Sequence, residues 1–186
     1  MGIILPALNE ASTVADCIRS VHGGWPKAEI VVVVGGDSAT ETAARRVAAE
    51  LRDVTVIRQN AHGKGAAVRE GLKMMQAPVI AQFDTDGQFP VAELERVIDA
   101  VRQNHADLCV GSRFMGRDRG STTAGGWPRR AGNRLLSAWV SLLTGHVCTD
   151  VTSGLKAWRR DLTERHPLSD SGYCYELEII IRTLRA

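Results

Sequence analysis

Three oxygen-bearing side chains, Asp84, Asp86 and Gln88, alternate along a short stretch that directly follows an apolar run at residues 79–83. Alternate residues of an extended segment point the same way, so these three can present their oxygens to one side. Hard divalent cations prefer oxygen ligands, and Mg²⁺ is typically held by one or two carboxylates together with substrate phosphates. The spacing therefore predicts a metal site for a phosphorylated ligand. A solvated turn is the alternative, because Asp and Gly also favour turns.

A second candidate is Lys64, which lies in the run His62-Gly63-Lys64-Gly65 ahead of a predicted helix. A helix that begins after a strand often offers free N–H groups to a phosphate, and a lysine there adds positive charge. Glycines are equally common where a chain turns tightly, so both interpretations stay open. Neither a P-loop nor a dinucleotide-binding fingerprint matches this segment.

Arginines dominate residues 113–134, where six arginines against one aspartate give a net charge of +5. They are Arg113, Arg117, Arg119, Arg129, Arg130 and Arg134. Residues 115–128 are also rich in Gly, Ser and Thr, which predicts a long loop of the kind that is usually functional or disordered. Because acidic partners are scarce, phosphate binding by arginine is at least as well supported as an ordinary solvated surface.

These residues need a scaffold, and the hydrophobic pattern predicts one in which strands and helices alternate. Short apolar runs predict strands near residues 2–5, 29–34, 54–57, 79–83, 107–111 and 151–158. Apolar residues at helical spacing predict helices near residues 14–21, 40–51, 66–75, 94–101, 131–143 and 177–184. Such alternation predicts an α/β fold with a mostly parallel, Rossmann-like sheet flanked by helices, whose ligands bind at the carboxyl ends of the strands.

Composition narrows the class of protein. The chain has 186 residues, 44% hydrophobic and 24% charged, which excludes a disordered or fibrous protein and suits one domain over residues 1–186. No apolar run is long enough to span a membrane and no signal peptide is recognisable, so we expect a cytoplasmic protein. Four scattered cysteines and five histidines without ligand spacing predict neither disulfides nor zinc. A net charge of +2 argues against binding to nucleic acid.

With these residues in view, the chain resembles the inverting glycosyltransferases of family 2, which have the GT-A fold, and most of all the branch related to dolichyl-phosphate mannose synthase. The resemblance covers essentially the whole chain, and the order and spacing of its motifs make it specific. The motifs are Pro6-Ala7-Leu8-Asn9-Glu10, Gly63-Lys64-Gly65 with Gly71, Asp84-Thr85-Asp86-Gly87-Gln88 before Pro90, Gly111-Ser112-Arg113-Phe114, Arg130 with Asn133, Asp150 with Ser153-Gly154, and Gly172-Tyr173 with Glu176.

The resemblance implies a role for each group of residues. Residues expected to contact the donor nucleotide are Pro6, Asn9, Glu10, Asp37, Lys64 and Asp84. Residues expected to hold Mg²⁺ or Mn²⁺ against the donor diphosphate are Asp84, Asp86 and Gln88. Residues expected to receive the acceptor phosphate are Arg113, Arg130 and Ser153. A phosphate acceptor is already a charged nucleophile and needs no strong base, but if a base exists we expect Asp150, which joins Arg113 and Arg130 as a predicted catalytic residue.

Two features depart from the family pattern. Relatives usually carry two Asp and then Gly-Ser after the second strand, whereas this chain has Gly35-Gly36-Asp37-Ser38. Two glycines let the backbone shift a neighbour by one residue, so we expect Asp37 to enter the nucleotide pocket, the alternative being a base held by backbone groups and shape. Relatives also continue beyond Glu176, so we expect a truncated chain whose last helix offers an apolar stripe to a homo-oligomer or a membrane.

The predicted activity is the metal-dependent transfer of a hexose from a UDP- or GDP-linked sugar to a polyprenyl or dolichyl phosphate. A lipid-phosphate acceptor implies peripheral membrane contact, which we expect at the cytoplasmic face. The alternatives are a family 2 enzyme with a soluble phosphorylated or carboxylated acceptor and a non-catalytic nucleotide-sugar binding module. A sugar nucleotidyltransferase ranks lower, because its basic Gly-rich loop after the first strand is replaced here by Ala7-Leu8-Asn9-Glu10.

Overall fold

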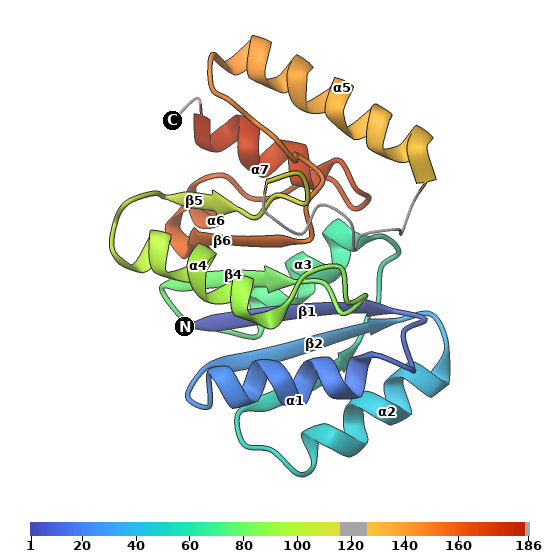
Figure 1. The fold of residues 1–186 in the computed structure, drawn as a ribbon. Coiled ribbons are helices and arrows are strands. Elements are labelled where there is room, and N and C mark those ends of the chain that lie inside the picture. The colour runs from blue at the N-terminus through green and yellow to red at the C-terminus, as the bar shows by residue number, and fades with distance from the viewer. Residues whose placement is uncertain (116–125, 185–186) are drawn as a thin grey trace.

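The computed structural model describes residues 1–115 and 126–184, with the backbone alone for residues 126–130. Within these residues, six strands form one sheet in the order β3-β2-β1-β4-β6-β5, with helices on both faces (Figure 1). The strands are β1 (Gly2–Leu8), β2 (Glu29–Gly35), β3 (Val54–Arg58), β4 (Val79–Phe83), β5 (Leu108–Val110) and β6 (Leu155–Arg159). The helices are α1 (Val14–Gly24), α2 (Ser38–Ala48), α3 (Lys64–Lys73), α4 (Val91–Arg102), α5 (Gly126–Thr144), α6 (Arg160–Arg165) and α7 (Tyr175–Leu184).

The sheet is mostly parallel, which confirms the prediction from the alternating pattern. Strands β3, β2, β1 and β4 run in parallel, and β6 lies antiparallel between β4 and β5. Parallel neighbours end at the same edge of the sheet, so the segments after β1, β2 and β4 meet there. Asn9, Asp37 and Asp84 lie in these three segments.

Each face of the sheet has its own apolar core, because successive residues of a strand point to opposite faces. On one face, Ile3 and Leu5 of β1 pack with apolar residues of α1, α2 and α4. On the other, Ile4 packs with apolar residues of α3, α5 and α7. Burial against the sheet, rather than local propensity alone, therefore fixes these helices.

Some element boundaries differ from the predictions. Strand β1 continues through Pro6 to Leu8, because its pairing with β4 stops at Ile4 and the proline costs no hydrogen bond on that side. The strand predicted at residues 151–158 begins only at Leu155, since Val151 and Thr152 form a turn and the chain bends at Gly154. Helix α5 begins at Gly126, five residues before the predicted start, and the short helix α6 was not predicted. Most of the loop predicted at residues 115–128 lies outside the described residues.

A glycine contact tests the packing of α3 on the sheet. A Cβ at Gly71 would lie 2.9 Å from Ile4 Cγ2 and 3.3 Å from Val33 Cγ2. We expect Gly71→Ala to lower the free energy of unfolding by about 1–3 kcal/mol, the usual effect of overpacking a core. Gly23→Ala on α1 is the control, because a Cβ there meets nothing within 4 Å and the substitution should be neutral or stabilising. Urea unfolding of both variants measures the difference; equal midpoints would contradict the packing described.

Candidate functional site

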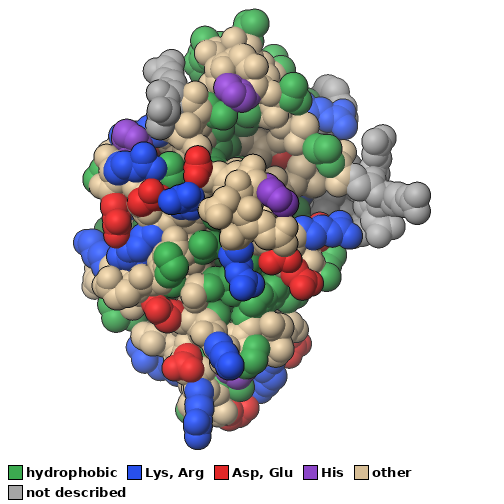
Figure 2. Space-filling model, turned by 90° about the vertical axis from the view of Figure 1, so that its left-hand side faces the viewer, with side chains coloured by type: hydrophobic (Ala, Val, Ile, Leu, Met, Phe, Trp, Pro, Cys, Tyr) green, Lys and Arg blue, Asp and Glu red, His purple; other side chains and the backbone are tan. Residues whose placement is uncertain are grey.

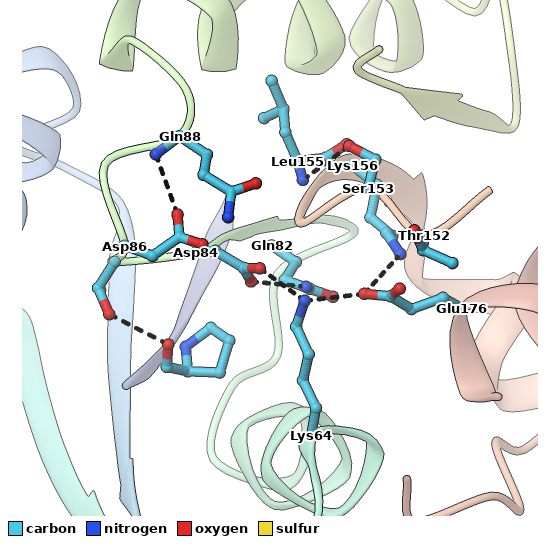
Figure 3. Close-up of polar contacts among 12 residues, drawn as sticks. Lys64, Gln82, Asp84, Asp86, Gln88, Thr152, Ser153, Leu155, Lys156 and Glu176 are labelled. Carbon is cyan, nitrogen blue, oxygen red and sulfur yellow. Dashed lines mark hydrogen bonds and ion pairs between the residues drawn. The ribbon is translucent and has the colours of Figure 1, made fainter. Parts of the chain in front are cut away.

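Asp84 directly follows β4, and residues of α3, of β4 and of the segment before β6 contact it (Figure 3). Its Oδ2 is 2.6 Å from Lys64 Nζ, and its Oδ1 accepts a hydrogen bond from Gln82 Nε2 at 3.1 Å. Its backbone N–H donates to the carbonyl of Gly154 at 3.1 Å. A Cβ at Gly154 would lie 1.9 Å from Asp84 Oδ2, so only glycine lets the turn before β6 approach this carboxylate so closely.

Asp86 and Gln88 lie on the exposed side of the same segment. Asp86 Oδ1 accepts a hydrogen bond from the backbone N–H of Gln88 at 3.0 Å, and Gln88 Oε1 accepts one from Arg113 Nη1 at 3.0 Å. Within the described part of the chain, no group of three or more His, Cys, Asp or Glu side chains is arranged to hold a metal ion. Two carboxylates and one amide nevertheless suit Mg²⁺ or Mn²⁺ when substrate phosphates complete the coordination shell.

Lys64 belongs to a buried cluster of charged side chains. Its Nζ is also 2.8 Å from Oε1 of Glu176, the second residue of α7, and Lys156 Nζ lies 3.6 Å from the same oxygen. Burial acts to lower the pKa of Lys64, but the carboxylates of Asp84 and Glu176 outweigh it and raise that pKa, so Lys64 stays charged. Whether Lys64 also contacts a nucleotide stays a prediction.

The glycines at the start of α3 allow it to pack closely against the segment before α7. The backbone N–H groups of Gly65 and Ala66 donate to the carbonyls of Gly172 and Ser171 at 3.0 and 3.1 Å. A Cβ at Gly63, whose φ is +101°, would lie 2.1 Å from the Ser171 carbonyl oxygen. These two N–H groups therefore bind the segment before α7 and are not available to a phosphate. Close packing of the chain explains the glycines of this segment better than phosphate binding does.

Arg113, which contacts Gln88, also forms a bidentate pair with Asp150. Arg113 Nε and Nη2 lie 2.8 and 2.9 Å from the two carboxylate oxygens of Asp150, and Asn133 Nδ2 donates to Asp150 Oδ1 at 2.7 Å. Hydrogen bonding to Asp150 raises the pKa of Arg113 further above its usual value. Because both oxygens of the buried Asp150 accept hydrogen bonds from the protein, its contacts favour orienting Arg113 over acting as a general base.

Ser153 and Arg130 are the two other residues predicted to bind the acceptor. Ser153 is completely buried, and its hydroxyl donates to the carbonyl of Leu155 and accepts from its N–H, at 3.3 and 3.2 Å. This hydroxyl shapes the turn before β6, so the geometry does not support contact with an acceptor. The side chain of Arg130 lies outside the described residues, and its role stays a prediction.

The predicted nucleoside residues lie at the ends of β1 and β2. Thr85 donates its hydroxyl to the Glu10 carboxylate and lies 3.2 Å from the Pro6 carbonyl oxygen, and the Glu10 N–H donates to Thr40 Oγ1 at 2.8 Å. Burial raises the pKa of Glu10 from 4.5 to about 8, and the nearby charges of Asp86 and Asp84 add to this effect. Glu10 is thus held beside the predicted metal ligands through Thr85.

Asp37 has a structural role that its sequence context does not predict. It is the N-cap of α2, where Oδ1 accepts a hydrogen bond from the Thr40 N–H at 2.7 Å, and that bond lowers its pKa. Its own N–H donates to Asn9 Oδ1 at 2.8 Å, and a Cβ at Gly36 would lie 2.0 Å from that oxygen. Its contact with a nucleotide base stays a prediction, but capping already accounts for the carboxylate.

Three buried residues beside the site are not predicted from the sequence. Gln82 in β4, Lys156 in β6 and Tyr175 in α7 are all buried and all contact the Asp84 and Glu176 carboxylates or each other. A lysine between Leu155 and Ala157 is the signal that could have found them, because a buried charge requires a partner.

The pKa of Glu10 predicts a pH dependence. A carboxyl whose folded pKa lies near 8 and whose unfolded pKa lies near 4.5 binds more protons when folded, so stability falls as pH rises between these values. Without divalent ions, Glu10→Gln should therefore gain in urea midpoint relative to the parent on going from about pH 5.5 to about pH 8.5. Glu95→Gln, at an exposed position on α4, serves as the control and should show no such trend. A constant difference between Glu10→Gln and parent would exclude the raised pKa.

Comparisons with known proteins show the family of this chain. Residues 2–165 match the sequence model of glycosyl transferase family 2. Glycosyltransferase AglJ of Haloferax volcanii is 30% identical over 181 residues, covering 96% of this chain and 56% of that protein. Polyprenol monophosphomannose synthase of Mycolicibacterium smegmatis is 29% identical over 191 residues, covering 98% of this chain and 71% of that protein.

A solved structure shares the fold. Glucosyl-3-phosphoglycerate synthase from Mycobacterium tuberculosis, in complex with Mn²⁺, UDP-glucose and phosphoglyceric acid, superimposes with a TM-score of 0.73 at 22% identity, covering 99% of this chain and 64% of that one. The likeness confirms the expected GT-A fold. The chain spans just over half the length of AglJ and about two thirds of the other two proteins. The chain belongs to glycosyl transferase family 2 and, within it, to the branch that resembles dolichyl-phosphate mannose synthase.

Proposed function

We propose that this chain is a metal-dependent, inverting glycosyltransferase that moves a hexose from a nucleoside diphosphate sugar to a polyprenyl phosphate. The observation that carries the proposal is the contact between Gln88 Oε1 and Arg113 Nη1 at 3.0 Å. It joins the oxygen ligands predicted to hold the donor's metal ion to an arginine suited to an anionic acceptor. The names of the relatives, among them polyprenol monophosphomannose synthase, support an acceptor of this class.

The donor half of the site consists of Asp84, Asp86 and Gln88 at the end of β4. Bound there, Mg²⁺ or Mn²⁺ would neutralise the diphosphate that leaves with the nucleoside. Lys64 and Gln82 hold the Asp84 carboxylate in one orientation, at 2.6 and 3.1 Å. A ligand whose orientation is fixed before the substrate arrives loses little freedom when the substrate binds.

The acceptor half depends on Arg113. An oxygen of the acceptor phosphate would attack the anomeric carbon as the bond to the donor diphosphate breaks, so one displacement inverts the configuration. The phosphate carries its charge at neutral pH, so no proton has to be removed from it. Among the described contacts, Arg113 uses Nε and Nη2 on Asp150 and Thr152 and one N–H of Nη1 on Gln88. The second N–H of Nη1 is the group we assign to the acceptor.

The surface of α5 supports a lipid acceptor. No helix in the described part of the chain is long and apolar enough to cross a membrane. Large hydrophobic side chains are nevertheless exposed on α5 and just after it. Figure 2 shows hydrophobic side chains at the top of the molecule, where α5 lies. The exposed residues are Leu135, Trp139, Leu142, Leu143 and, just after the helix, Val147.

This apolar surface continues into a pocket of about 330 Å³, whose wall includes Leu108, Val147, Ile180 and Leu184. We assign the α5 surface to peripheral contact with the cytoplasmic face of a membrane, where an amphipathic helix lies in the interface. Flotation with liposomes tests this assignment, and a chain that stays wholly unbound would contradict it.

The donor half of the site is tested at Asp86. Asp86→Asn removes one negative charge from the metal ligands without changing the size of the side chain. Nucleoside diphosphate release in the presence of Mn²⁺ and acceptor should fall by roughly 100-fold or more, as expected when a metal site is disrupted. Asp107→Asn, beside β5 at the opposite edge of the sheet, is the control and should keep the parent rate. Parent activity in the Asp86 variant would remove this residue from the site.

A second prediction concerns Arg113. Lysine keeps the charge but cannot form the paired contact with Asp150, so the side chain is no longer oriented. For Arg113→Lys we expect the acceptor KM to rise by about tenfold or more, a loss of ~1.4 kcal/mol, with a smaller change in the donor KM. Arg96→Lys, an exposed position on α4, is the control. A donor KM that rises as much as the acceptor KM would place Arg113 elsewhere in the mechanism.

A further inference from the structure

Two polar residues interrupt the core between the sheet and helices α3 and α7. Gln82 of β4 lies directly opposite Lys156 of β6 in the antiparallel register. They share a face with Ile80 and Trp158, which belong to the apolar core on that side. Both are 0% exposed, so this face carries a buried amide and a buried amine where its neighbours are apolar.

Both residues lead to Glu176. Lys156 Nζ lies 3.6 Å from Glu176 Oε1 and 5.2 Å from the centre of the Tyr175 ring, and the Tyr175 hydroxyl is 2.7 Å from Gln82 Oε1 and 3.2 Å from Glu176 Oε1. Glu176 is 1% exposed, and the same Oε1 lies 2.8 Å from Lys64 Nζ. A continuous chain of contacts thus runs from β6 through α7 to Lys64 and Asp84 (Figure 3).

The buried charges of Lys156 and Glu176 are not expected to stabilise the fold. Among the described residues, neither Lys156 Nζ nor Glu176 Oε2 has a hydrogen-bond partner. Replacing buried charged groups by apolar residues of similar volume is often neutral or stabilising, so packing alone does not require them. What the cluster does achieve is to give the Lys64 ammonium a second carboxylate, so that its charge is not directed at Asp84 alone.

We propose that Glu176 is a positioning residue that, held by Lys156 and Tyr175, shares the Lys64 ammonium with Asp84 and leaves Asp84 able to bind the donor's metal ion. Without Glu176, Lys64 pairs with Asp84 alone and competes with the cation for that carboxylate. Glu176 touches neither substrate nor metal in this account. The inference rests on the proposed function, because it assigns Asp84 to a metal ion.

The test is Mn²⁺ binding, measured by the electron paramagnetic resonance signal of free Mn²⁺ in the presence of UDP and, separately, GDP. Glu176→Gln keeps an oxygen for Lys64 but loses the charge, and should weaken Mn²⁺ binding by about tenfold or more, the usual effect of losing a partner behind a metal ligand. Glu176→Asp keeps the charge and should recover part of the affinity.

Two further variants separate positioning from folding. Glu178→Gln, on the same helix, removes a carboxylate that binds the backbone N–H groups of Ser169 and Asp170 outside this cluster. It should leave the Mn²⁺ affinity unchanged. The double variant Glu176→Gln with Lys156→Met removes both buried charges, so it should recover stability against urea while Mn²⁺ binding stays weak.

Each outcome bears on the proposal. Unchanged Mn²⁺ affinity in Glu176→Gln, or parent affinity in the more stable double variant, would overturn the positioning role and leave the proposed function standing. A parent chain that binds no Mn²⁺ with either nucleotide would overturn the metal site of the proposed function, and this inference with it.

Discussion

The ion pair between Lys64 and Asp84 is the contact on which the rest of the site depends. It joins the first residue of α3 to the first residue after β4, and both positions follow from the parallel sheet. Glycines at the surrounding approaches keep the partners close: Gly154 admits the turn before β6, and Gly63 and Gly65 admit the segment before α7. Elements far apart in the sequence are thereby fixed around one carboxylate.

Charge is distributed unevenly around that carboxylate. Behind it lie the half-buried Lys64 and the buried Glu176 and Lys156, which solvent screens only weakly. In front lie Asp86 and Gln88, which are accessible to a ligand, and beyond them Arg113 held by Asp150. An anionic donor with its cation and an anionic acceptor would therefore meet at one edge of the sheet, between opposite charges that the fold orients in advance.

The sequence predicts the fold well, because periodic apolar runs are local signals. The alternating Asp84, Asp86 and Gln88 form a local signal as well, and their role as metal ligands stays a prediction. The buried half depends on tertiary contacts. Lys156 and Gln82 face each other only through strand register, and Tyr175 reaches Gln82 across 93 positions of sequence. The same limit explains Asp37, whose carboxylate caps α2, and Ser153, whose hydroxyl turns back onto Leu155. In both, a hydrogen bond to the nearby backbone satisfies a side chain that looked available for a ligand.

In the proposed function, the end of β4 brings a metal-bound sugar donor to a lipid phosphate. The most direct measurement is transfer of radiolabelled hexose from a panel of UDP- and GDP-sugars to polyprenyl phosphate in liposomes, followed by extraction into organic solvent. We expect label in the organic phase with Mg²⁺ or Mn²⁺ and none when EDTA removes the metal. Transfer that persists in EDTA, or label found only in water-soluble products such as a glycosylated phosphoglyceric acid, would contradict it.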